Sequence, residues 1–372
     1  EQKEDMESGA AAAHAGGVGT VCDMPNTNPA TVSIAALEEK IEISQHIENV
    51  DIRFFFGATK SEHVEEFKKA WGMPKLREKL VGLKIFFDNS TGDQGADTSV
   101  IKEAFKVCAE IGAPLVGHCE DASINAEAKK MILGQMPDTE DVSLHSLMRP
   151  CASEVTAVEQ AIALVREHGT QFHVAHLSTA QGVELVRQAK KEGLPITCEV
   201  TPHHLFLSIH DYSNLGSRGK MNPPLRSIDE QQALWKGISD GTIDCISTDH
   251  APHLLSEKKE GNPLNAPSGV PGAETMLPLL LAVAAGGWPA RPKPEGEGGP
   301  HPESKKPDIN FSYEDIAKLC FENPNRIFSL GKKDENQIQI ETDTEWIIQG
   351  KDLHSKCGWT PYEGWKVKGK IL

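Results

Sequence analysis

One pattern repeats along most of this chain: a short apolar run, then a polar cluster, then a stretch with helical periodicity. Such runs predict buried strands, and their alternation with helices predicts βαβ units of a parallel sheet. We predict seven strands, at residues 18–24, 52–57, 82–87, 114–117, 172–175, 195–200 and 242–248. The helices predicted between them cover residues 34–47, 62–70, 98–111, 154–167, 180–191 and 229–238.

Seven βα units predict an α/β fold, a TIM-like (β/α)8 barrel of the metal-dependent hydrolase type. Its first strand is expected upstream of Glu1. The alternative is a doubly wound sheet, which normally has a Gly-rich phosphate turn after an early strand. The turn after Met24 is Pro25-Asn26-Thr27 instead, so the barrel is favoured.

The barrel is expected to occupy residues 1–335, and a small, incomplete β appendage formed by the chain termini is expected at residues 336–372. Apolar and polar residues alternate over 338–348, which predicts a half-exposed strand, while residues 313–321 have a helical pattern. Residues 284–307 are dominated by Gly, Pro, Lys and Glu. This composition predicts a flexible surface insertion.

The composition points to a catalytic domain that acts on a small molecule. A formal net charge of −16 over 372 residues disfavours nucleic acid as a partner, because phosphate binding needs clustered Lys and Arg. The eight cysteines form no CxxC pair, which favours a reducing, cytoplasmic location. No apolar run approaches the roughly 20 residues of a membrane span.

Four predicted strands carry residues that can bind a metal at or near their carboxyl ends: Lys84, His118, His176 and Asp249. Each one alone is more often structural, but in a TIM barrel these ends converge on the face where active sites form. Two imidazoles and a carboxylate suit zinc, with manganese or cobalt as alternatives. A lysine can join them only if CO₂ converts its amine to a carbamate, which burial favours by stabilising the neutral amine.

With these residues in place, the chain resembles the dihydroorotase family of the amidohydrolase superfamily, particularly the class with the dihydroorotase domain of animal multifunctional pyrimidine enzymes. The resemblance covers almost the whole chain. Dihydropyrimidinases and allantoinases share the metal-binding positions, so two other segments favour dihydroorotase: Met-Pro-Asn-Thr at residues 24–27 and Lys-Met-Asn-Pro-Pro-Leu-Arg at residues 220–226.

The resemblance implies a zinc-dependent cyclic amidohydrolase (EC 3.5.2.3) that interconverts N-carbamoyl-L-aspartate and L-dihydroorotate in de novo pyrimidine (UMP) biosynthesis. It implies two Zn²⁺ ions per chain, bridged by carboxylated Lys84. His118 and His176 would bind the second ion, and Asp249 would be a ligand and proton shuttle. The substrate would be held by a set of polar and backbone groups: Asn26, Asn222, His253, Ser268 and Gly269.

The family's opening His-x-His-x-Arg motif is expected just upstream of Glu1, because every later ligand position is intact; the alternative is a degenerate relative. The family also implies a homodimer, and membership of a pyrimidine-synthesis assembly is a further expectation. Two other functions stay open, an allantoinase- or dihydropyrimidinase-like hydrolase and a non-catalytic scaffold. Residues 88–95 form either an ordinary loop or a lid, and His203 and His204 either support the site or belong to the core.

Overall fold

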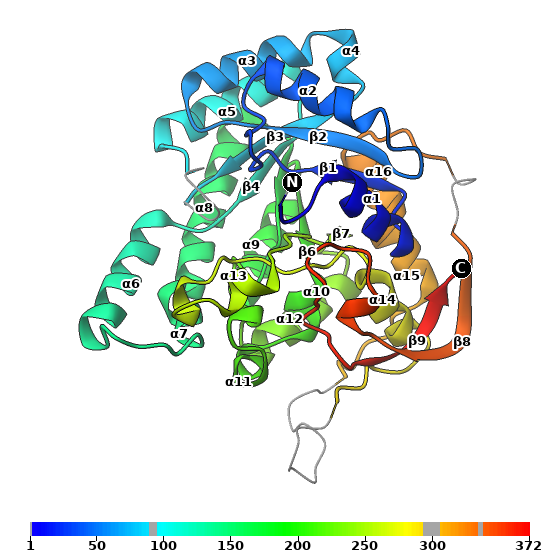
Figure 1. The fold of residues 1–372 in the computed structure, drawn as a ribbon. Helices are drawn as coiled ribbons and strands as arrows, with labels where there is room; N and C mark the ends of the chain where they lie inside the picture. Colours follow the sequence, from blue (N-terminus) through cyan, green and yellow to red (C-terminus); the bar gives the residue numbers. More distant parts are fainter. Residues whose placement is uncertain (1, 89–94, 293–305, 334–337) are drawn as a thin grey trace.

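The computed structural model describes residues 2–88, 95–292, 306–333 and 338–372. Seven parallel strands form one curled sheet in which each strand pairs with the next along the chain (Figure 1). All seven predicted strands are confirmed: β1 Thr20–Asp23, β2 Asp51–Gly57, β3 Leu80–Phe86, β4 Leu115–His118, β5 Phe172–Val174, β6 Ile196–Val200 and β7 Cys245–Ile246. The α/β, TIM-like barrel architecture is therefore confirmed as well.

Helices cover the outside of the sheet, as βαβ connections require. Every residue of β3 is buried, because one face of the strand packs on helices and the other lines the barrel interior. α5 turns its apolar stripe inward and ends at Gly112, whose φ of 65° suits glycine. The main helices on this side are α2 Ile34–Ser44, α3 Ser61–Trp71, α5 Thr98–Ile111, α8 Cys151–His168, α9 Ala180–Lys191 and α12 Ile228–Ser239. α6 Ala122–Gln135 packs against α8 instead.

Short helices fill several of the connections between the strands and the longer helices. They are α4 Pro74–Arg77, α7 Leu144–Met148, α10 Pro202–Phe206, α11 Tyr212–Leu215 and α13 Leu255–Lys259. Short 3₁₀ turns lie at Ile209–Asp211, Gly216–Gly219, Pro263–Asn265 and Gly350–Asp352.

Two predicted elements differ from the structure in detail. β7 is shorter than predicted, although Asp244 and Ser247 on its flanks still bond to β6. The helix predicted at residues 313–321 consists of two parts, α15 Tyr313–Ala317 and a π-helical turn at Lys318–Glu322. α16 Asn323–Ile327 follows directly. Pro324 lacks an N–H for a regular helical bond, and the preceding Asn323 N–H bonds to the carbonyl of Lys318 instead.

Part of the predicted insertion at residues 284–307 packs against the barrel. Trp288 contacts the rings of Phe206 and Trp235 at centroid distances of 5.0 and 5.8 Å, and Arg291 forms an ion pair with Asp211. Residues 293–305 of this segment lie outside the described residues, so its predicted flexibility stays untested.

A two-stranded antiparallel sheet lies at the C-terminal end of the chain, formed by β8 Ile340–Ile347 and β9 Lys366–Ile371. It packs on α14 Met276–Ala284, where a Cβ on Gly369 would lie 2.8 Å from Leu281. At the other end of the chain, α1 Met6–Ala15 begins after the capping residue Asp5. The division into a barrel and an appendage at residue 335 stays a proposal.

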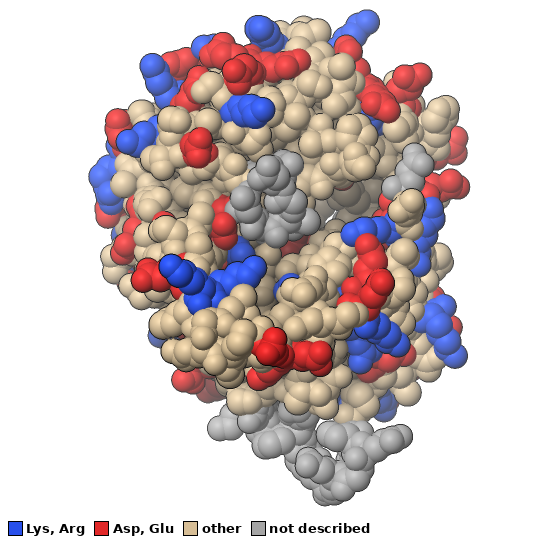
Figure 2. Space-filling view, turned by 60° about the vertical axis from the view of Figure 1, so that its left-hand side comes forward, with Lys and Arg blue, Asp and Glu red and all other residues tan. Residues whose placement is uncertain are grey.

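The surface is chemically mixed. On the face in Figure 2, basic and acidic side chains of the described residues are interspersed. The prediction that nucleic acid is not a partner stays untested. All eight cysteines are free thiols. Among the described helices, none is long and apolar enough to cross a membrane.

Candidate active site

The four predicted metal-binding residues lie at the carboxyl ends of their strands. Lys84 lies near the end of β3, and His118 is the last residue of β4. His176 and Asp249 follow β5 and β7. Because all seven strands run parallel, these ends lie at one edge of the curled sheet.

His118 and His176 face each other inside the barrel. Nδ1 of His118 lies 2.9 Å from Nε2 of His176, and Nε2 of His118 lies 2.8 Å from a carboxylate oxygen of Glu120. Because the carboxylate only accepts, Nε2 of His118 carries the hydrogen and Nδ1 presents its lone pair. Burial lowers the pKa of His118, and it lowers that of His176 well below its usual value. Two neutral imidazoles therefore meet at this point, with Nε2 of His176 donating to Nδ1 of His118.

Lys84 is only 2% exposed. Its Nζ lies 5.0 Å from the centre of the Phe86 ring. Burial lowers the pKa of Lys84 to about 8, although nearby Glu199 and Asp249 act in the opposite direction. The neutral amine is thus far more populated near neutral pH than in an exposed lysine.

Asp249 and His176 share an unusual backbone conformation. Their φ values are 40° and 36°, and among the described residues only Ser329 is a further non-glycine residue with positive φ. Such conformations are costly outside glycine and cluster at functional sites. Burial raises the pKa of the Asp249 carboxyl to about 6, while the charge of Lys84 partly opposes this shift.

The donor set fits a divalent metal of the zinc type. Within the described part of the chain, no three His, Cys, Asp or Glu side chains lie close enough together to form a metal cluster by themselves. Two imidazole nitrogens do converge, and Nδ1 of His176 is buried without a partner. Lys84 and Asp249 interact electrostatically, so a carbamate on Lys84 would add the oxygen donors that the histidine pair lacks.

Glu120 connects the histidine pair to a buried ionic network. Its fully buried carboxylate accepts from Arg149 at 2.7–3.0 Å, and Arg149 also donates to Asp88 at 3.0 Å. Asp88 in turn accepts from Asn125 at 2.7 Å. Burial by itself would raise the pKa of Glu120, but Arg149 and His118 hold it well below its usual value. The network keeps a charged carboxylate against the His118 ring.

Most of the predicted substrate-binding groups lie on one wall. Nε2 of His253 lies 3.0 Å from the carbonyl oxygen of Ser268. The adjacent Gly269 donates its N–H to the carbonyl of Lys220, two residues before Asn222. Gly269 has a φ of 134°, and a Cβ there would lie 2.6 Å from the carbonyl oxygen of Ala251. Only glycine fits this close approach.

The other positions named from the sequence are Asn26, His203, His204 and the predicted lid. Asn26 lies in the turn after β1, half-buried at the same edge of the sheet. His204 belongs to the core, because Thr201 and the carbonyl of Pro223 hold its ring nitrogens at 2.8 and 3.0 Å. His203 is also buried, but its Nε2 has no partner. Residues 89–94 of the predicted lid lie outside the described residues.

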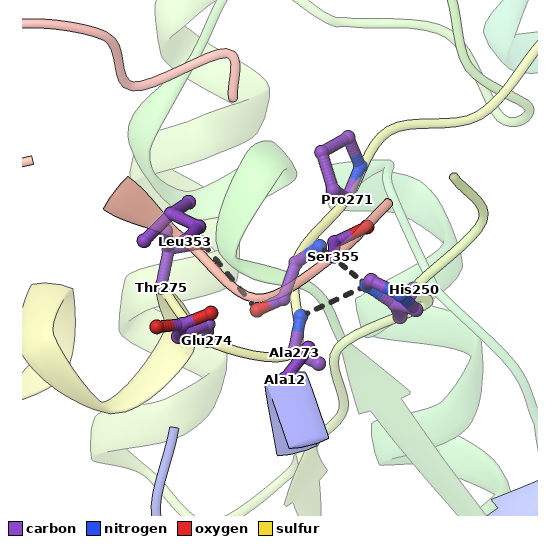
Figure 3. Close-up of a pocket in the computed structure, with 9 residues that line it drawn as sticks. Ala12, His250, Pro271, Ala273, Glu274, Thr275, Leu353 and Ser355 are labelled. Atoms are coloured by element: carbon purple, nitrogen blue, oxygen red, sulfur yellow. Dashed lines mark hydrogen bonds between the residues drawn. The ribbon is translucent and has the colours of Figure 1, made fainter. Parts of the chain in front are cut away.

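A small cavity lies beside His250, the residue that follows Asp249 (Figure 3). Nδ1 of His250 accepts from the N–H groups of Gly272 and Ala273 at 3.0 and 3.2 Å. The cavity measures about 10 Å³ and also borders Ala12 of α1. It has room for about one water molecule, which is too little for a substrate.

The comparison with known proteins agrees with this geometry. The model of the amidohydrolase family matches residues 1–290. A dihydroorotase of Methanosarcina mazei is 36% identical over 382 residues, covering 97% of this chain and 75% of that protein. The chain belongs to the dihydroorotase family of amidohydrolases. The dihydroorotase of Halobacterium salinarum, also 36% identical, matches 98% of the chain and 78% of its own length.

The chain is also similar to part of a larger protein and to a solved structure. The multifunctional protein CAD of Squalus acanthias is 31% identical over 99% of this chain, which spans 14% of that protein. The solved structure of an L-hydantoinase (dihydropyrimidinase) from Arthrobacter aurescens matches with a TM-score of 0.85 and 24% identity, over 99% of this chain and 78% of that one. This last likeness shows the shared fold alone.

Sequence reasoning missed several residues of this dihydroorotase-family site. Arg149 and Glu120 were not among the predicted site residues, and Asp88 was predicted only as part of the loop or lid at residues 88–95. His145 was also missed, although its Nε2 lies 2.9 Å from Oδ1 of Asn222. The one signal available was the place of Glu120 two residues after His118. Arg149 and His145 come from α7 and its flank, and no local pattern marks them.

Replacing Glu120 by glutamine is expected to weaken zinc binding by about 10- to 100-fold, because the amide cannot hold the His118 ring with a negative charge. Competition with a chelating dye measures the change. Asp211→Asn is the matched control, since Asp211 is also a buried carboxylate paired with arginine. Equal zinc affinity in Glu120→Gln and the unaltered protein would refute this role.

Proposed function

We propose that this chain catalyses the reversible cyclisation of N-carbamoyl-L-aspartate to L-dihydroorotate. The observation that carries the proposal is 34–36% identity to three dihydroorotases over 97–98% of the chain. The convergence of His118 and His176 beside buried Lys84 supports it. These are the residues that a hydrolytic metal site needs at the carboxyl edge of a barrel.

The cofactor that fits this donor set best is Zn²⁺, because imidazole nitrogen and carboxylate oxygen are its common ligands. We propose two ions per chain, which carboxylated Lys84, His118, His176 and Asp249 would hold, with the two histidines as ligands of the second ion. Bound zinc supplies Lewis-acid activation of a water molecule and of the ring amide carbonyl.

Lys84 acquires its carboxyl group by a simple reaction. The neutral amine attacks the carbon of CO₂, a nitrogen–carbon bond forms as one C=O π bond breaks, and the nitrogen then loses one proton to solvent, so the product is an anionic carbamate. The lowered pKa of Lys84, about 8, supplies the neutral amine near physiological pH. Its buried position also protects the carbamate from water.

Asp249 moves the proton that the reaction requires. In the hydrolytic direction its carboxylate takes a proton from the attacking water and delivers it to the departing ring nitrogen. In the cyclisation direction the same group helps remove oxygen from the side-chain carboxylate of carbamoyl-aspartate as water. Acidic conditions favour ring closure, because they protonate that carboxylate.

The substrate carboxylate distinguishes this reaction from its relatives. We propose that Asn26, Asn222 and His253 hold the polar groups of the substrate, while the backbone at Ser268 and Gly269 lies against the pyrimidine ring. Allantoin and dihydrouracil lack a carboxylate, so an allantoinase- or dihydropyrimidinase-like activity is the less favoured alternative. A homodimer, a place in a pyrimidine-synthesis assembly and a cytoplasmic location stay predictions.

The test measures how fast the full-length protein turns over L-dihydroorotate, dihydrouracil and allantoin. The loss or gain of ring absorbance reports turnover, and the metal content is measured on the same sample. Dihydroorotate should be the preferred substrate by at least about 100-fold in kcat/KM, since the ring-held carboxylate adds charge-assisted bonds. Preference for dihydrouracil or allantoin would contradict the proposal and indicate a dihydropyrimidinase- or allantoinase-like enzyme. A metal-free protein without activity would favour a non-catalytic scaffold.

A further inference from the structure

Two buried lysines lie behind the substrate wall, and the proposed reaction does not use them. Lys258, the next-to-last residue of α13, is 1% exposed. Its Nζ donates to three backbone carbonyls, those of Ser217, Lys220 and Pro267, at 3.3, 3.0 and 2.7 Å. A neutral amine has two hydrogens, so three acceptors require the ammonium form.

Lys220 makes the complementary connection. It is 9% exposed, and its Nζ donates to the carbonyls of Leu264 and Ala266, both at 2.6 Å. Its own carbonyl accepts from Lys258 and also from the N–H of Gly269 at 3.0 Å. The two side chains therefore join residues 217–222 to residues 264–269 at several points.

These ammonium groups are costly to bury. Within the described residues, neither Nζ lies within ion-pair distance of a carboxylate; Lys258 instead lies 5.7 Å from the centre of the Trp359 ring. Burial lowers the pKa of Lys258 to about 7 and that of Lys220 to about 8. A buried, unpaired charge is a poor way to stabilise a fold. Together the two ammonium groups donate to five backbone carbonyls, which indicates that they hold the backbone in place.

The backbone that they hold carries the proposed substrate contacts. Residues 217–222 end at Asn222, and residues 264–269 end at Ser268 and Gly269. The carbonyl of Ser268 in turn holds Nε2 of His253 at 3.0 Å. We propose that Lys220 and Lys258 are positioning residues, an ammonium clamp that fixes the two segments of the substrate wall relative to each other. This proposal rests on the proposed function in one respect only, namely that the substrate bound by this wall is dihydroorotate.

Lys258→Met tests the clamp, because methionine keeps much of the side-chain volume and removes all three donors. We expect KM for dihydroorotate to rise by about 10- to 100-fold while kcat changes less than about threefold, since the wall binds substrate and does not take part in bond breaking. Amide hydrogen exchange at residues 264–269 should become faster. Lys220→Met should produce the same two changes.

Lys190→Met is the matched control. Lys190 also donates to a backbone carbonyl, that of Thr242 at 2.7 Å, but at the amino-terminal edge of the sheet. It should leave KM and exchange at residues 264–269 unchanged. A purely structural role for Lys258 would lower the melting temperature without a selective rise in KM, which would overturn the clamp.

The exchange measurement separates this proposal from the proposed function. If the unaltered protein does not turn over dihydroorotate, the function fails, and exchange at residues 264–269 still decides whether the clamp exists. Unchanged exchange in soluble Lys258→Met would reject the clamp even in an active enzyme. If Lys258→Met does not fold, Lys220→Met carries the same test with the same two outcomes.

Discussion

Lys84→Ala is expected to lose turnover of dihydroorotate by about a thousandfold or more, equivalent to about 4 kcal/mol of transition-state stabilisation. Among the described residues, Lys84 has the only amine in the barrel centre that can become a carbamate, and the substitution removes it. Without that anion, His118 and His176 are left with too few donors for two cations. The zinc content should fall together with kcat/KM.

Chemical rescue makes this prediction specific. The cavity left by the lysine side chain is small and buried, so acetate or propionate can supply a carboxylate at the missing position, and should restore part of the zinc content and activity. Lys40→Ala is the control, since Lys40 is a buried lysine paired with Asp23 on the far side of β1 from the site. Full activity and two zinc ions in Lys84→Ala would disprove the carbamate.

Asp249→Asn is expected to lower kcat by about a thousandfold, because the amide cannot accept and return a proton. Activity is measured alongside zinc content, so that a lost proton acceptor is distinguished from a lost ligand. Asp244→Asn is the control: it lies at the start of β7, where its carboxylate pairs with Lys190 at 2.6 Å. If Asp249→Asn retains most of kcat, another group moves the proton.

The metal-free protein offers a second measurement on Asp249. Burial raises its pKa to about 6, so the carboxylate is present above pH 6 and protonated below. Zinc affinity should therefore fall as the pH falls through about 6, by up to about tenfold per pH unit. His118 and His176 have lowered pKa values and add less to this change. In Asp249→Asn the decrease near pH 6 should disappear; an identical profile would contradict the assignment.

The strands and the metal-binding positions could be predicted because both depend on local sequence. A run such as Leu80–Phe86 has no polar residue except Lys84, so it can only be a buried strand with one exceptional side chain. Parallel topology then brings the strand ends together without further information. For the same reason His118 and His176 could be assigned to one site before any distance was known.

The partners of these residues could not be predicted in this way. Arg149 reaches Glu120 across 29 residues of sequence, and His145 reaches Asn222 across 77. Lys258 looks like an ordinary surface lysine at the end of a short polar helix, yet the fold buries it completely. Nothing in the periodicity of the chain distinguishes these side chains from solvent-exposed ones.

The sequence by itself determined the parallel α/β barrel, its strand order and the edge where chemistry can take place, because hydrophobic periodicity and strand direction are local and cumulative. Only the tertiary structure decided which nitrogen of His118 faces His176, how Glu120 keeps its charge, and which carbonyls hold Lys220 and Lys258. These features depend on desolvation and hydrogen-bond geometry between distant segments, and both arise only when the barrel closes around them.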